Sequence, residues 1–237
     1  MAQTLDVQSS GGSMGLYEAE PDGAARGAIV VVQEAFGVNG HIEDVCRRFA
    51  AEGYRAVAPH LFHRSGDPTI EYEDMQTVVE HIMQLSADGL EADLDATLGH
   101  LADAGFAAPR VGVVGFCMGG SVSLLAAARH PLGAAVTFYG GGVAEGRFGM
   151  PALVELAPQL QTPWLGVFGD QDQTIPVEQV EALRTAAASA SVPTEIVRYA
   201  DAEHGFHCDA RSSYHEASAK DAWKRALQWF DTYLSKA

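Results

Sequence analysis

Cations and long apolar runs are scarce in this 237-residue sequence. It has 15 Lys and Arg against 31 Asp and Glu, a formal net charge of −16. A partner bound mainly through phosphates needs clustered cations, so we expect no nucleic acid and no anionic membrane as a partner. No apolar run is long enough to span a bilayer, and the first residues lack the pattern of a secretion signal. We therefore expect a cytoplasmic protein.

Cysteine is also rare. The three cysteines, Cys46, Cys117 and Cys208, are odd in number and lack CxxC spacing. Neither a disulfide framework nor a structural zinc site is expected from such a set. A lone cysteine is more often a small buried hydrophobe than a reactive group, so the flanking sequence has to distinguish the three.

No Pro/Ser-rich linker divides the chain, and 47% of its residues are hydrophobic. We expect one domain over residues 1–237. Apolar runs typical of buried strands alternate with helical segments, which predicts an α/β fold with a mainly parallel central sheet and helices on both faces. The predicted strands are Ala28–Gln33, Tyr54–Ala58, Val111–Gly115, Ala134–Tyr139, Trp164–Phe168 and Thr194–Tyr199. The predicted helices are His41–Glu52, Glu71–Ser86, Glu91–Ala104, Gly119–Arg129, Val177–Ala190 and Ala217–Leu234. Residues Thr4–Glu20 are predicted to form an antiparallel hairpin at one sheet edge.

One of the cysteines stands in a turn with a catalytic pattern. Gly115-Phe116-Cys117-Met118-Gly119 lies between a predicted strand and a predicted helix. In a nucleophile elbow the central residue is strained, and glycines two residues away remove the Cβ atoms that would clash. The helix N-terminus also favours a thiolate and an oxyanion. A buried cysteine in a glycine turn is the alternative, but the strand and helix on either side favour a nucleophile at Cys117.

The partners that such a nucleophile needs follow in the order acid, then histidine. Asp170 and Asp172 follow one predicted strand, and His204 and His207 follow the next. We favour Asp172, because Asp170 adjoins the glycine that ends the strand, although spacing alone does not decide between them. We favour His204, because Gly205 leaves its imidazole room.

A further carboxylate follows the first parallel strand. Glu34 emerges from an all-apolar run, which predicts a partly buried group near the active face. A helix cap or a structural hydrogen bond is the alternative. The same loop corresponds to the place where α/β-hydrolases supply their second oxyanion amide, so we assign the hole to the backbone N–H groups of Ala35 and Met118.

These motifs together resemble the dienelactone hydrolase (carboxymethylenebutenolidase) family of the α/β-hydrolase superfamily. The resemblance lies in Gln33–Asn39, Gly115–Gly120, Gly169–Pro176 and His204-Gly205-Phe206, in the expected order. It implies a Cys117-Asp172-His204 triad that hydrolyses a small lactone or ester without metal or cofactor. It also implies that Glu34 is a switch that helps to generate the thiolate when substrate binds.

The substrate is less well defined. Family members that cleave dienelactone hold its carboxylate with arginines, one of them four residues after the histidine, where this chain has Cys208. No Lys or Arg occurs from Ser65 through Pro109, so Arg64, His207 or Arg211 would have to substitute. As further contacts we name Phe36, Tyr139 and Phe206, and Phe62, Met118 and Trp164 as candidate pocket walls. Hydrolysis of a thioester or another activated acyl group, and a non-catalytic ligand-binding or redox-sensing role, stay open as alternatives.

Overall fold

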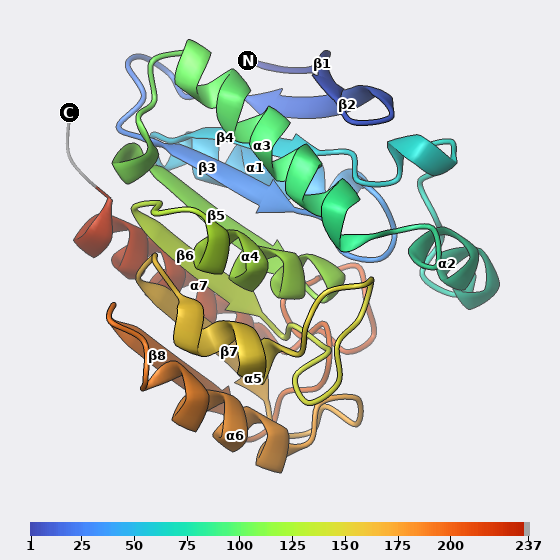
Figure 1. The fold of residues 1–237 in the computed structure, drawn as a ribbon, viewed down its shortest axis with the longest axis vertical. Helices are drawn as coiled ribbons and strands as arrows, with labels where there is room; N and C mark the ends of the chain where they lie inside the picture. Colours follow the sequence, from blue (N-terminus) through green and yellow to red (C-terminus); the bar gives the residue numbers. More distant parts are fainter. Residues whose placement is uncertain (235–237) are drawn as a thin grey trace.

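Eight strands form one mixed sheet in the computed structural model, which describes residues 1–234 (Figure 1). The strands are β1 (Ala2–Ser9), β2 (Gly12–Ala19), β3 (Ala28–Val32), β4 (Arg55–Pro59), β5 (Val111–Phe116), β6 (Ala134–Phe138), β7 (Trp164–Gly169) and β8 (Thr194–Tyr199). Their order is β1-β2-β4-β3-β5-β6-β7-β8, and every pairing from β4 to β8 is parallel. The predicted α/β fold with a mainly parallel sheet is confirmed, and β1 and β2 form the predicted antiparallel hairpin at its edge.

Helices cover both faces of this sheet. They are α1 (Gly40–Ala51), α2 (Met75–Ile82), α3 (Ala87–Asp103), α4 (Met118–Arg129), α5 (Leu153–Leu156), α6 (Val177–Ala187) and α7 (Glu216–Tyr233). In Figure 1, α1 and α7 lie behind the sheet and α3, α4, α5 and α6 lie in front of it. Phe49 of α1 packs on Trp223 of α7, with ring centroids 4.5 Å apart. Within residues 1–234 no helix is both long enough and apolar enough to cross a membrane.

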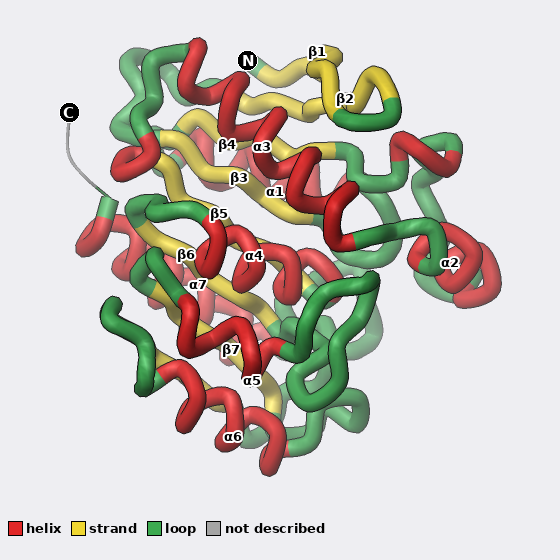
Figure 2. Tube along the Cα trace, viewed as in Figure 1, coloured by secondary structure: helices red, strands yellow, loops and turns green. Residues whose placement is uncertain are grey.

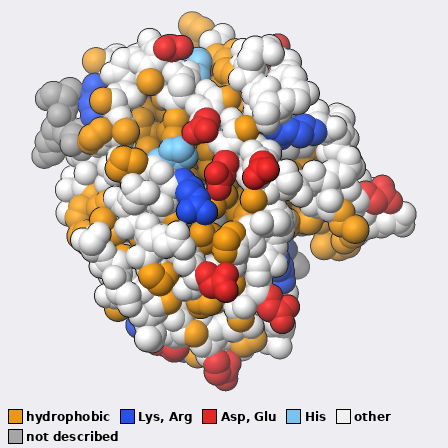
Figure 3. All heavy atoms as spheres, viewed as in Figure 1, with side chains coloured by type: hydrophobic (Ala, Val, Ile, Leu, Met, Phe, Trp, Pro, Cys, Tyr) orange, Lys and Arg blue, Asp and Glu red, His pale blue; other side chains and the backbone are white. Residues whose placement is uncertain are grey.

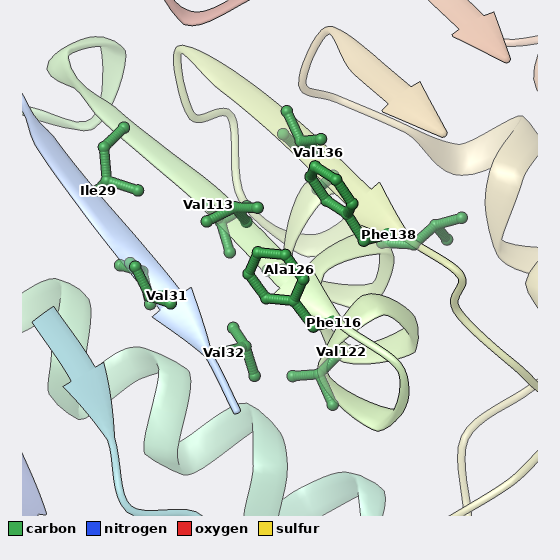
Figure 4. Packing of buried hydrophobic residues seen from close by; sticks show 14 of the residues in the cluster. Ile29, Val31, Val32, Val113, Phe116, Val122, Ala126, Val136 and Phe138 are labelled. Carbon is green, nitrogen blue, oxygen red and sulfur yellow. The ribbon is translucent and has the colours of Figure 1, made fainter. Parts of the chain in front are cut away.

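The central strands are apolar along their whole length because neither face meets water. Every residue of β3, β5, β6 and β7 is buried. Figure 4 shows Val113 and Phe116 of β5 close to Val136 and Phe138 of β6, with Val122 of α4 packed nearby. Strands with two covered faces lack alternating polar residues, which is why continuous apolar runs identified them in the sequence.

The sheet order places a ligand site between β3 and β5. From β3 the chain moves to β4 on one side and later returns to β5 on the other side. At such a switch point the connections leave in opposite directions, and a crevice forms at the carboxyl ends of the strands. Loops gather at this end of the sheet in Figure 2. Glu34 follows β3 and Cys117 follows β5, so both come at the carboxyl ends of these two strands.

Some predicted boundaries are wrong. The single helix predicted over Glu71–Ser86 is the shorter α2, and α3 begins before Glu91. Two N-caps fix where the helices begin, since Asp74 accepts a hydrogen bond from the Thr77 amide at the start of α2 and Ser86 accepts one from the Gly89 amide at the start of α3. The four-residue helix α5 was not predicted, because it is too short to show a helical period.

Candidate active site

The turn around Cys117 is held by close backbone contacts. Cys117 has φ 53° and ψ −115° and directly precedes α4. A Cβ atom on Gly115 would lie 1.8 Å from the carbonyl oxygen of Gly119, and one on Gly119 would lie 2.3 Å from the carbonyl oxygen of Val32. Both contacts are with backbone atoms, which cannot move aside cheaply. The two glycines are therefore sterically required, and they set the Cys117 side chain above the end of the sheet.

Cys117, His204 and Asp172 form a chain of hydrogen bonds. His204 Nε2 lies 3.0 Å from Cys117 Sγ, and His204 Nδ1 lies 2.6 Å from Asp172 Oδ2. The other oxygen of Asp172 accepts hydrogen bonds from the amides of Thr174 and Ile175 and from the Thr174 hydroxyl. The carboxylate is thus fixed in place by its own loop, and the imidazole is oriented between acid and thiol.

The alternatives in the two loops have different surroundings. Asp170 forms a two-pronged ion pair with Arg198, with N–O distances of 2.7 and 2.8 Å. His207 is buried and stacks on Phe116, with ring centroids 5.1 Å apart. Neither side chain lines the crevice within the described chain. The structure thus brings Asp172 and His204, rather than Asp170 and His207, to the cysteine.

The electrostatics of this chain of bonds favour an ion pair. Burial opposes protonation of His204, but the charge of Cys117 and the hydrogen bond to Asp172 outweigh it and raise the pKa of His204 above its ordinary value. Burial would raise the pKa of Asp172, yet hydrogen bonds from His204 and Thr174 lower it. The two shifts together favour an imidazolium at His204 beside an ionised Asp172.

Glu34 is fully buried beside this group. Its Oε1 lies 3.4 Å from the hydroxyl of Tyr139, which donates to it, and 3.6 Å from Nη1 of Arg211. Its Oε2 has no hydrogen-bond partner among the described residues. The carboxylate is therefore held from one side only, by a phenol and a guanidinium.

A cavity of about 790 Å³ opens in front of Cys117. Ala35, Phe36, Met118 and His204 line it at the strand ends, as the sequence predicted for the first three. Met118 is the first residue of α4, where a backbone N–H has no acceptor within its own helix. Ala35 and Met118, whose amides the sequence assigned to the oxyanion hole, thus both line the cavity together with Cys117.

The outer wall of the cavity was not predicted from the sequence. It consists of apolar side chains on and just after α2, namely Met75, Val78, Val79, Ile82, Met83 and Leu85. Met75, Val79 and Met83 are 55%, 50% and 79% exposed. Hydrophobic side chains gather over α2 at the right of Figure 3. The apolar spacing of this segment indicated a helix, but gave no sign that its apolar face borders a cavity.

Two arginines also line the cavity, although cations were expected to be scarce there. Arg211 was one of the open candidates, whereas Arg147 was missed. Arg147 lies in the loop after β6, at the carboxyl edge of the sheet, and this position was the available signal. Neither hydrogen bonds nor ion pairs involve its side chain within the part of the chain that is described.

Three predicted contacts lie elsewhere. Arg64 forms an ion pair with the buried Asp93, 2.7 Å from Nη1 to Oδ2, and so anchors α3 instead of facing the cavity. Tyr139 and Phe206 are 0% exposed and pack on each other, with ring centroids 5.4 Å apart. Tyr139 still borders the triad from behind, because its ring packs on that of His204 with centroids 5.1 Å apart and its hydroxyl donates to Glu34. The candidate wall residues Phe62 and Trp164 are likewise core residues.

Comparison with known proteins identifies the family of this chain. The family model described as "Dienelactone hydrolase family" matches residues 14–234. The chain belongs to the dienelactone hydrolase family. A Salmonella typhimurium protein that carries the provisional name carboxymethylenebutenolidase is 44% identical over 241 residues, which cover 99% of this chain and 88% of that protein. The carboxymethylenebutenolidase of Rhodococcus opacus is 31% identical, over 92% of this chain and 85% of its own.

A solved structure of the same family is closely similar. The crystal structure of a Klebsiella pneumoniae protein, provisionally named a dienelactone hydrolase, has a TM-score of 0.90 and 43% sequence identity. The match covers 98% of this chain and 99% of the other. This dienelactone hydrolase family member therefore has the α/β-hydrolase fold and is an ester or lactone hydrolase acting on a small molecule.

Proposed function

We propose that this family member hydrolyses its ester or lactone through a Cys117-His204-Asp172 triad. The observation that carries the proposal is the continuous contact from Asp172 Oδ2 to His204 Nδ1 and from His204 Nε2 to Cys117 Sγ, at 2.6 and 3.0 Å. Nucleophile, base and orienting acid each need one such contact. The strained turn and the cavity in front of the sulfur supply access for a carbonyl carbon.

The chemistry proceeds in two halves. The Cys117 thiolate attacks the carbonyl carbon, and the amides of Ala35 and Met118 hold the oxyanion. The carbon–oxygen bond of the leaving group breaks, and the His204 imidazolium gives its proton to that oxygen. Neutral His204 then takes a proton from water, the hydroxide attacks the thioester, and the acid and the thiolate are released. Asp172 stabilises the charge on the imidazole throughout.

Glu34 has a separate part in the proposal. As a switch, it would accept the proton of the Cys117 thiol when substrate enters and return it to the thiolate when the product leaves. While Glu34 is protonated and neutral, its attraction to Arg211 is weaker. Only Oε1 of Glu34 contacts Tyr139 and Arg211, and Oε2 has no hydrogen-bond partner among the described residues. This arrangement supports a carboxylate that can change partners.

The cavity favours a substrate with an apolar portion. Its volume of about 790 Å³ is in the range that encloses drug-sized ligands, well above the size of a small lactone. The apolar wall on α2 would cover a hydrophobic acyl or alcohol group, and Arg147 and Arg211 would suit a negative substituent. An activated acyl thioester fits the same cavity and belongs in the test panel.

The test compares hydrolysis of lactones, aryl esters and acyl thioesters by the native enzyme, Cys117→Ala and His204→Ala. We expect both variants to lose at least about 1,000-fold in kcat with the best substrate, because the two groups act as a unit. Far-ultraviolet circular dichroism controls for folding. Native rates in either folded variant would refute the triad.

A further inference from the structure

Behind the nucleophile lies a second cluster of reactive side chains that the proposed hydrolysis leaves mostly unused. Glu34, His41 and Cys208 each offer one ligand atom, and these three atoms lie within 4.8 Å of one another. All three residues are buried. They come from the β3 loop, the first turn of α1 and the loop after His204, so only the folded chain brings them together.

Two polar atoms of this cluster are buried without a partner. Within residues 1–234, neither Glu34 Oε2 nor His41 Nε2 has a hydrogen-bond donor or acceptor in reach. A buried carboxylate oxygen and a buried imidazole nitrogen are each unfavourable when unpaired, by about 1–3 kcal/mol. Two such atoms in one cluster indicate a ligand that both of them can bind.

We propose that Glu34, His41 and Cys208 form a site for a zinc-like divalent cation, and that an ion bound there inhibits the hydrolase by holding Glu34. Thiolate, imidazole and carboxylate are the ligand types that Zn²⁺ takes, whereas Mg²⁺ and Ca²⁺ prefer oxygen alone. In a tetrahedral zinc site the ligand atoms lie roughly 3.5 Å apart, so the side chains need to close by little more than about 1 Å.

Neighbouring groups are suited to support these ligands. The hydroxyl of Tyr72 lies 3.2 Å from Cys208 Sγ and itself accepts a hydrogen bond from the side-chain Nδ2 of Asn39, so it can donate to a thiolate. Nδ1 of His41 lies 3.9 Å from a carboxylate oxygen of Asp209. This separation is too long for a hydrogen bond, so Asp209 acts on the His41 ring through its charge alone.

An ion would reach the cluster from the cavity. Arg211 lines the cavity and contacts Glu34, so an ion reaches the cluster when this side chain moves aside.

The test uses Co²⁺ as a spectroscopic substitute for Zn²⁺, on the full-length native protein, Cys117→Ser, Cys208→Ser and Cys46→Ser. We expect a thiolate-to-cobalt charge-transfer band in the native protein, in Cys117→Ser and in the Cys46→Ser control, and its loss in Cys208→Ser. Zn²⁺ should displace the cobalt. It should also raise the melting temperature of the same three proteins but not of Cys208→Ser, because a ligand of the native state alone stabilises that state.

Inhibition is measured in parallel with the best ester of the panel. Zn²⁺ should slow the native enzyme and Cys46→Ser, while Cys208→Ser keeps its rate at the same zinc concentration. The expected inhibition rests on the proposed role of Glu34, whereas metal binding at the cluster does not. The inhibition can therefore fail while the binding site stands.

Two results would overturn the site. One is the absence of the cobalt band from every protein, which would mean that the cluster does not bind a metal ion. The other is a band lost in Cys117→Ser and kept in Cys208→Ser, which would place the metal on the nucleophile. Binding at Cys208 without loss of hydrolysis would overturn the inhibitory role.

Discussion

Gly119 leaves no room for a side chain between the nucleophile turn and β3. A methyl group at this position would meet the backbone of Val32 and Gln33, at 2.3 and 2.4 Å from their carbonyl oxygens. We expect Gly119→Ala to lower the free energy of unfolding by about 3 kcal/mol and to reduce kcat/KM strongly, because the turn has to shift. Urea denaturation and ester hydrolysis measure the two effects.

Gly99 provides the matched control. It lies on the exposed side of α3, and nothing is within 4 Å of a Cβ added there. Gly99→Ala should stabilise the protein by up to about 1 kcal/mol, since alanine is the better helix former. Equal stability changes in the two variants would show that the close contacts at Gly119 carry no energetic weight.

Glu34→Gln tests the switch at the level of one proton. A neutral amide can neither accept the Cys117 proton nor repel a thiolate, so the profile of the alkylation rate against pH should differ from that of the native enzyme. Iodoacetamide labelling of Cys117, followed by mass spectrometry, measures this profile. An unchanged profile would defeat the switch.

Much of the candidate site is visible in the sequence because its residues follow apolar strands. Cys117, Glu34, Asp172 and His204 all stand shortly after such runs. The choice of Asp172 over Asp170 depended on loop geometry, which spacing does not determine. Arg147 was missed because its loop has no regular period, so its position relative to the crevice is fixed only by tertiary packing.

At the scale of elements, α2 is a helix with an unusual exposed apolar side. It borders the cavity and lies at the margin of the molecule, away from the sheet (Figures 1 and 3). Val79→Ser should lower kcat/KM for octanoate esters by about tenfold or more and leave acetate esters nearly unchanged. The reason is that burying a valine side chain against a ligand contributes about 1.5–3 kcal/mol.

Gln76→Ser is the control for this helix. Gln76 is exposed on α2 and does not line the cavity, so its replacement should affect neither ester class. If Val79→Ser lowers activity toward acetate and octanoate equally, the helix supports the fold of the site but does not select the acyl chain.

The element pattern also shows where sequence reasoning stops. Continuous apolar runs located β3, β5, β6 and β7 to within about two residues, since strands buried on both faces have no other composition. The segment at 71–86 read as one helix because its apolar spacing continues across the break between α2 and α3. The N-caps at Asp74 and Ser86 each depend on one side-chain hydrogen bond. The spacing of apolar residues carries no information about such single contacts.

For the molecule as a whole, buried histidine links stability to pH. Burial, together with the charges of Arg48 and His41, holds the pKa of His207 well below its ordinary value. The folded protein keeps His207 neutral, whereas the unfolded chain binds a proton below about pH 6.5. This contribution to stability is complete above that pH. It is lost as the pH falls, by at most about 1.4 kcal/mol per pH unit.

Urea denaturation at about pH 7 and pH 5 measures this dependence. His207→Phe removes the titrating group from its place between Phe116 and Trp223 and should flatten the change in unfolding free energy between the two pH values. The same slope in native protein and variant would assign the acid sensitivity to other groups.

The spacing of the triad along the chain has a consequence for biosynthesis. Cys117 and His204 are separated by 87 positions, and β6, β7 and β8 lie between them in the sequence. During translation, Cys117 therefore leaves the ribosome well before His204 has been added to the chain. In the proposed triad, Cys117 therefore meets its histidine only after β8 has joined the edge of the sheet, which is one of the last events of synthesis.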